Sequence, residues 1–172
     1  MQHAPSGKVT LRPLEMADAP RMAELANNKN ISINLRDGFP HPYTLEHAKN
    51  FVEMCMAQDP TTIFGIIYEG EYVGNVGLTK GTDVYRKSAE LGYFLGEPYW
   101  NMGIMPQAVN LATQFAFETL DVVRVFSGVF EYNLASQRVL EKCGFTREAV
   151  LKKAVFKNGQ LWDEIRYAKL RE

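Results

Sequence analysis

Hydrophobic and polar residues follow two different periods in the first part of the chain. Residues 8–14, KVTLRPL, alternate as a β-strand does. Two segments with apolar side chains every three or four residues predict helices, one at 18–28 with Asp18 as its cap and one beginning just after Thr44. Between them, the polar run 34–43 contains glycine and prolines, which predicts a long irregular loop.

The middle of the chain is rich in β-branched and aromatic residues. Residues 61–68 and 72–79 are separated by a short Glu-Gly-Glu turn and predict a hairpin, and 88–95 supplies a third antiparallel strand. A helical pattern within 99–117 then precedes the apolar run 122–130. Because a helix between two strands is the usual crossover of a parallel pair, we expect 88–95 and 122–130 to run parallel.

The last part of the chain predicts one more helix and a hairpin. The helix lies within 133–145, is capped by Asn133 and is terminated by Gly144 in the left-handed conformation. Residues 154–170 predict the hairpin, since Asn158-Gly159 suits a two-residue turn between strands.

Composition narrows the class of protein. The chain has 172 residues, without repeats or linkers, which predicts one domain, 1–172. Its 19 Lys and Arg against 20 Asp and Glu argue against a bulk nucleic-acid binder. Cys55 and Cys143 lack partners at metal-ligand spacing and are expected to be buried. No apolar run approaches the roughly 20 residues of a membrane span, and the N-terminus lacks a secretory core, so a cytoplasmic protein is expected.

One helix start stands out because no acidic or hydroxyl residue caps it. In YWNMGIMPQA, residues 99–108, the backbone N–H groups between Met102 and Gln107 are left for a ligand. Gly103 allows close approach to the backbone and Pro106 fixes a helical φ in the first turn. Such a start suits a pyrophosphate, although a tight turn with its methionines in the core is the simpler interpretation of this stretch alone.

Together with AELGYFL and NLASQRVLEKCGF, this stretch resembles the Gcn5-related N-acetyltransferase (GNAT) superfamily, in its branch similar to ribosomal-protein N-terminal acetyltransferases. The resemblance extends to VFKNGQLWDEIRYAKL and covers nearly the whole chain. It implies an α/β fold whose mixed, mostly antiparallel sheet is splayed at residues 88–95, with helices on both faces. It also implies acetyl-coenzyme A as cosubstrate, without a metal. The implied coenzyme-binding residues are Phe94, Leu95, Met102, Gly103, Ile104, Met105, Pro106, Asn133 and Ser136.

The chain departs from the family pattern at two places. Branch members commonly have Trp-Gly-x-Gly where this chain has Trp-Asn-Met-Gly at 100–103. Since Asn tolerates the left-handed region, Asn101 is expected to keep the backbone path, and Met105 can present its N–H if its side chain enters the core. Leu140 stands where many members have a tyrosine that protonates the thiolate, so Ser136 becomes the candidate acid, with a structural helix-turn serine as the alternative.

The remaining candidates concern the acceptor amine. Glu90 matches a position where relatives hold a carboxylate facing that amine and would accept its proton, directly or through water; the alternative is an ordinary strand carboxylate. The irregular segment 30–43 and the late hairpin should supply the acceptor pocket, with Arg36, Phe39, His41 and Tyr43 as the candidate residues. As alternatives, His41 is a surface residue and the two aromatic residues pack the loop onto the sheet.

The energy of deprotonation favours one class of acceptor. A lysine-type amine of pKa about 10.4 costs roughly 4.6 kcal/mol to deprotonate at pH 7, whereas an α-amino group near 7.8 costs about 1 kcal/mol. We therefore expect a protein or peptide N-terminus. A polyamine or aminoglycoside acceptor, a catalytically silent acyl-coenzyme A sensor and, less favoured, a doubly wound nucleotide-binding domain are alternatives. The protein is expected to be a monomer or homodimer that acts away from membranes.

Overall fold

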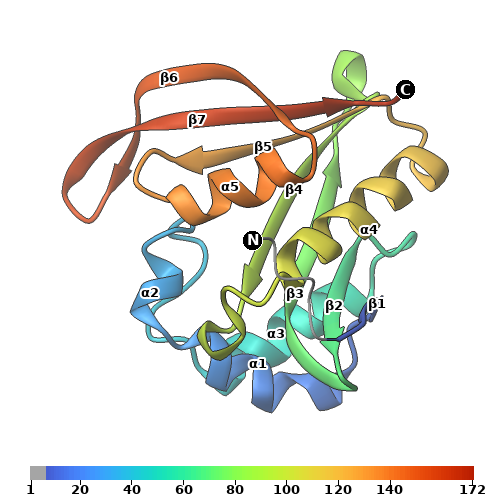
Figure 1. Cartoon of the computed structure of the whole chain (residues 1–172). Helices are drawn as coiled ribbons and strands as arrows, with labels where there is room; N and C mark the ends of the chain where they lie inside the picture. Colours follow the sequence, from blue (N-terminus) through green and yellow to red (C-terminus); the bar gives the residue numbers. More distant parts are fainter. Residues whose placement is uncertain (1–6) are drawn as a thin grey trace. The chain divides into compact units, whose positions relative to one another are not determined.

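The computed structural model describes residues 7–172 (Figure 1). These residues form two compact units. The first holds the described residues up to Gly77 together with Tyr93–Ala108, and the second holds Leu78–Gly92 and Val109–Glu172. Seven strands are hydrogen-bonded in the order β1-β2-β3-β4-β5-β7-β6. The predicted fold class, a mixed and mostly antiparallel sheet with helices, is confirmed. That the whole chain is one domain stays a prediction.

The strands of the first unit lie where their patterns predict them. β1 (Val9–Pro13) pairs antiparallel with β2 (Ile63–Tyr68), and β2 pairs antiparallel with β3 (Glu71–Lys80). Glu69 and Gly70 turn the hairpin with φ of 50° and 81°. The predicted third strand is β4 (Ser88–Leu95), which has the predicted boundaries and whose last residues belong to this unit.

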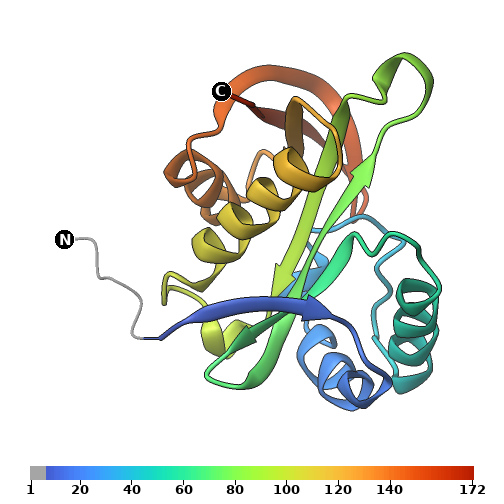
Figure 2. The same cartoon turned by 90° about the vertical axis from the view of Figure 1, so that its right-hand side faces the viewer.

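Three helices complete the first unit: α1 (Ala19–Ala26), α2 (Lys29–Ser32) and α3 (Leu45–Met56). α1 and α3 pack against each other (Figure 2), and their apolar faces form a core with Tyr72 and Phe94. Thr44 caps α3 as predicted, since its hydroxyl accepts a hydrogen bond from the His47 amide at 3.2 Å. The sequence pattern missed α2 because four residues are too few for a recognisable helical period.

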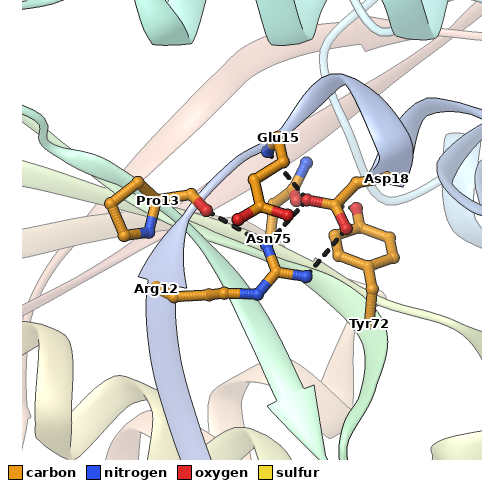
Figure 3. A network of polar contacts seen from close by, with 6 residues as sticks. All are labelled: Arg12, Pro13, Glu15, Asp18, Tyr72 and Asn75. Carbon is orange, nitrogen blue, oxygen red and sulfur yellow. Dashed lines mark hydrogen bonds and ion pairs between the residues drawn. The ribbon is translucent and has the colours of Figure 1, made fainter.

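Asp18 holds the predicted N-cap position of α1, but its side chain makes no capping bond to that helix, so its predicted capping role is wrong. It ends a one-turn 3-10 helix, Met16–Asp18, and its carboxylate turns back to accept hydrogen bonds from the Glu15 amide at 2.9 Å and from Arg12 Nη1 and Nη2, both at 2.8 Å (Figure 3). Burial alone would raise the pKa of Asp18, but the bonds from Arg12 and Glu15 outweigh it and lower that pKa.

The second unit contains the crossover and the last hairpin. β4 and β5 (Arg124–Phe130) pair parallel, as predicted. α4 (Ile104–Thr119) begins in the first unit and ends in the second, and α5 (Leu134–Lys142) follows β5. β7 (Gln160–Leu170) pairs antiparallel with both β5 and β6 (Thr146–Lys157).

The turn and cap residues of this unit have the predicted conformations. Asn158 and Gly159 join β6 to β7 with φ of 52° and 77°, and Gly144 follows α5 with φ of 83°. Asn133 caps α5, since its side-chain oxygen accepts from the Ser136 amide at 3.2 Å. β6 begins well before the predicted residue 154, because register shifts between Arg147 and Ala149 and between Leu151 and Val155 interrupt the alternation by which a strand is recognised.

Both cysteines are buried, as predicted, and neither is in a disulfide. Burial raises the pKa of each thiol to about 11. Within residues 7–172, no three His, Cys, Asp or Glu side chains gather in a way that would hold a metal ion. No helix in that same range is both long enough and apolar enough to span a bilayer.

Candidate active site

The parallel ladder between β4 and β5 is short. Within the second unit it joins Ser88–Glu90 to Arg124–Phe126, although both strands continue beyond these residues. The next connection comes from a side chain, because the Ser127 hydroxyl donates to the Leu91 carbonyl at 2.9 Å. Ser127 is buried, and its hydroxyl satisfies the Leu91 carbonyl at the point where the ladder ends.

We expect Ser127→Ala to lower the free energy of unfolding by about 1–2 kcal/mol, since it leaves the Leu91 carbonyl without this donor. Ser127→Thr retains the hydroxyl and should cost less. Urea denaturation of the two variants and the wild-type protein measures the difference. Equal losses for both variants would mean that volume at this position, rather than the hydrogen bond, sets the stability.

The proposed coenzyme loop, residues 101–106, has two left-handed residues just before α4. Asn101 has φ of 62° and Gly103 has φ of 74°. The expectation that Asn101 adopts the left-handed conformation is therefore confirmed. Ile104 and Met105 are buried, which meets the condition that the Met105 side chain enters the core. The first-turn N–H groups of α4 have no partner within the helix, by the geometry of any α-helix.

The chain that enters this loop is tied down by hydrogen bonds within the first unit. The Trp100 indole donates to the Leu95 carbonyl at 2.8 Å, and the Gly96 amide donates to the Val73 carbonyl at 2.9 Å. A β-carbon on Gly74 would lie 2.3 Å from the Phe94 carbonyl oxygen, so β3 requires glycine at the point where β4 passes. The backbone of Phe94 and Leu95 is thus held closely by neighbouring main chain.

Three predicted site residues lie in the second unit. Glu90 is half-buried on β4 between the buried Ala89 and Leu91, which share the opposite face of the strand. Asn133 and Ser136 are half-buried at the first turn of α5. Leu140, one turn further along α5, has no exposed surface, so an apolar core residue fills the position of the family tyrosine.

The predicted acceptor residues divide into exposed and packed side chains. Arg36 and His41 are exposed. The Phe39 ring contacts those of Tyr43 and Phe94, with centroids 5.0 Å and 5.5 Å apart. Burial raises the pKa of Tyr43 to about 12. Phe39 and Tyr43 therefore make packing contacts, as the alternative interpretation of these two residues predicted. An acceptor-binding role for all four residues stays a prediction.

Polar side chains that no sequence pattern singled out hold the turn before the loop. Asn28 and Asn30 bond to Glu97, and Arg21 bonds to Tyr99. The cluster of asparagines in ANNKN was a usable signal, since asparagine is uncommon inside helices and favours caps. Glu97, the partner of these asparagines, was not predictable from the sequence, because it lies far along the chain, 69 residues after Asn28.

Comparison with known proteins identifies the family to which the chain belongs. Residues 8–146 match the family model of the acetyltransferase (GNAT) domain. The chain is 31% identical to the probable N-acetyltransferase YjcK of Bacillus subtilis over 91% of its own length and 90% of that protein, and 29% identical to spermidine N(1)-acetyltransferase of Escherichia coli K12 over 92% and 83%.

Among solved structures, it resembles RimL, a ribosomal L7/L12 α-N-protein acetyltransferase in complex with coenzyme A. The TM-score is 0.83 and the identity 25%, with 98% of this chain and 97% of that chain covered. The match to the family model spans most of the chain. The similarity to the probable N-acetyltransferase YjcK also extends over most of both chains. The chain belongs to the Gcn5-related N-acetyltransferase family.

Proposed function

We propose that this N-acetyltransferase transfers the acetyl group of acetyl-coenzyme A to the α-amino group of a protein or peptide N-terminus. The observation that carries the proposal is the loop 101–106. Its left-handed Asn101 and Gly103 lead into the N-terminus of α4, where backbone N–H groups and the helix dipole favour an anion. The pyrophosphate of the coenzyme is the anion that this loop would hold. The residues involved would be Met102, Gly103, Ile104, Met105 and Pro106, the last of them in the first turn of α4.

Main-chain and side-chain groups would hold the rest of the coenzyme. The Leu95 carbonyl accepts from the Trp100 indole, so we assign the contact of Leu95 with the pantetheine arm to its N–H group. Phe94 would contribute main-chain groups of the same strand. Asn133 would contact the arm through its amide nitrogen, since its side-chain oxygen caps α5.

The proposed reaction is direct attack on the thioester. The neutral amine forms a C–N bond to the acetyl carbon, the C–S bond breaks, and the coenzyme leaves as a thiolate. Glu90 takes the proton that the amine loses, directly or through one water, and the Ser136 hydroxyl supplies a proton to the sulfur and is reprotonated from solvent. The products are an acetamide and coenzyme A, so the step needs no oxidant or reductant.

The choice of an α-amine rests on the cost of deprotonation. With one carboxylate as the candidate base, an acceptor that loses its proton for about 1 kcal/mol at pH 7 is favoured over one that costs roughly 4.6 kcal/mol. The resemblance to RimL, whose name states an α-N-protein acceptor, supports this choice. The similarity to spermidine N(1)-acetyltransferase supports the second candidate, a polyamine, and makes it the natural competitor in an assay.

The test is a calorimetric titration of the purified protein with acetyl-coenzyme A, followed by thiol-release assays. Peptides with unblocked N-termini, the same peptides with blocked N-termini, and spermidine serve as acceptors. Faster release with the unblocked peptides than with spermidine supports the proposal, and the reverse order supports the polyamine. Binding without turnover on any of these amines would indicate the silent acyl-coenzyme A sensor instead.

Glu90→Gln gives a separate test of the base. We expect kcat with an unblocked peptide to fall by roughly 100-fold, the usual contribution of a positioned general base, while the Kd for acetyl-coenzyme A stays within a factor of two or so. Unchanged kcat would remove Glu90 from the mechanism and leave it as a strand carboxylate.

A further inference from the structure

The turn that leads into the coenzyme loop is bonded to the segment that leads into the predicted acceptor loop. In the turn Glu97–Tyr99, Glu97 Oε1 accepts a hydrogen bond from Asn28 Nδ2 at 3.2 Å and Oε2 accepts one from Asn30 Nδ2 at 2.9 Å. Both carboxylate oxygens are therefore held by one short stretch at the start of α2. All three side chains belong to the first unit.

The same stretch is also bonded to the far end of the acceptor loop. Asn27 Oδ1 accepts a hydrogen bond from the Tyr43 amide at 3.0 Å. Asn28 Oδ1 accepts from the Asn30 amide at 2.9 Å and caps α2, whose last residue precedes the acceptor segment, residues 33–43. Asn28 and Asn30 thus bond the carboxylate of Glu97, and the adjacent Asn27 holds the far end of the acceptor segment.

A second set of contacts fixes the turn from the side of α1. The Arg21 guanidinium donates to the Tyr72 carbonyl at 2.7 Å, donates to the Tyr99 hydroxyl, and lies 5.7 Å from the centre of the Tyr99 ring. A β-carbon on Gly96 would meet Leu25 Cδ2 at 2.8 Å, so the backbone of the turn lies directly against α1. Tyr99 and Glu97 are held independently, only a few residues before Asn101.

We infer that Glu97 is a positioning residue that couples coenzyme binding in the loop 101–106 to the order of the acceptor segment 33–43. The inference rests on the proposed function of that loop. A displacement of the turn would move Glu97 and, through two charge-assisted hydrogen bonds, Asn28 and Asn30 at the start of α2. Asn27, which holds the far end of the segment, is the residue next to Asn28 in the chain. Because coupling free energies are reciprocal, an acceptor that orders the segment would also tighten the binding of the coenzyme.

Hydrogen exchange with coenzyme A as the probe measures this coupling. In the wild-type protein we expect saturating coenzyme A to slow amide exchange at least threefold or so in residues 33–43, remote in sequence from the loop. Glu97→Gln should abolish most of that protection and raise the Kd for coenzyme A roughly tenfold, since an uncharged amide can satisfy only one of the two asparagine donors. Glu53→Gln, on the exposed face of α3, is the matched control and should behave as wild type.

A reversed pair separates coupling from a loss of structure. Asn30→Asp alone would bring two carboxylates together and should weaken protection as Glu97→Gln does. The double variant Asn30→Asp/Glu97→Gln exchanges the hydrogen-bond donor and acceptor between the two positions. Their summed charge is the same as in the wild-type protein, so the variant should restore most of the protection. A double variant no better than the single variants overturns the inference. If the wild type binds coenzyme A without protection at 33–43, this inference alone fails; if it does not bind, the proposed function fails.

Discussion

Gly103→Glu is expected to weaken acetyl-coenzyme A binding by at least roughly 100-fold. Two effects act together. Gly103 has φ of 74°, where an L-residue is strained by roughly 1–2 kcal/mol. The new carboxylate would also face the pyrophosphate, and like charges about 4 Å apart repel by about 4 kcal/mol at an effective dielectric constant of 20. Calorimetric titration with acetyl-coenzyme A measures the loss.

Gly103→Asn is the control for backbone strain. Asparagine tolerates the left-handed conformation, as Asn101 does with φ of 62°, and adds no charge. Its Kd should rise by less than roughly tenfold. If the glutamate and asparagine variants bind equally well, the loop does not hold the pyrophosphate. If wild-type protein fails to bind acetyl-coenzyme A, the proposed function is wrong.

Asp18→Ala is expected to lower the free energy of unfolding by about 3 kcal/mol. The buried carboxylate accepts three hydrogen bonds, two of them from the Arg12 guanidinium (Figure 3), and truncation leaves the partly buried cation without its counter-ion. The ion pair joins β1 to the turn before α1, so its loss should loosen the core of the first unit. Denaturant unfolding measures the change, and Asp59→Ala, at an exposed loop position, should stay within about 0.5 kcal/mol of wild type.

The same pair predicts the pH dependence of this difference. The pKa of Asp18 is lowered in the folded protein, so the unfolded chain binds its proton more readily than the folded one. The stabilisation is therefore fully present above about pH 4, the usual pKa of an aspartate, and is lost as the pH falls through the lower folded pKa. Wild type and Asp18→Ala should converge in stability in that acid range. A difference that stays constant down to pH 2 or so would contradict the ion-pair explanation.

The sequence alone determined the order and type of most elements of this protein. The alternation at 8–14 and the β-branched and aromatic runs at 61–68, 72–79 and 88–95 placed β1, β2, β3 and β4 within a residue or two, because strands favour such side chains on a pleated, half-buried surface. The turn at Asn158-Gly159 and the caps at Thr44 and Asn133 depend on local hydrogen bonds and φ preferences, which neighbouring residues specify. Asn101 belongs to the same class, since its side chain tolerates the left-handed region.

Only the tertiary structure decided which distant groups meet. Asp18 had the position of a cap, yet it bonds to Arg12 and the Glu15 amide, because a charged partner on β1 competes successfully for its oxygens. The bonds of Glu97 to Asn28 and Asn30 and of Ser127 to Leu91 join residues far apart in the chain, where no local pattern reports a partner. Local preferences fix the elements through backbone energetics, whereas the polar contacts of the candidate site depend on packing between elements.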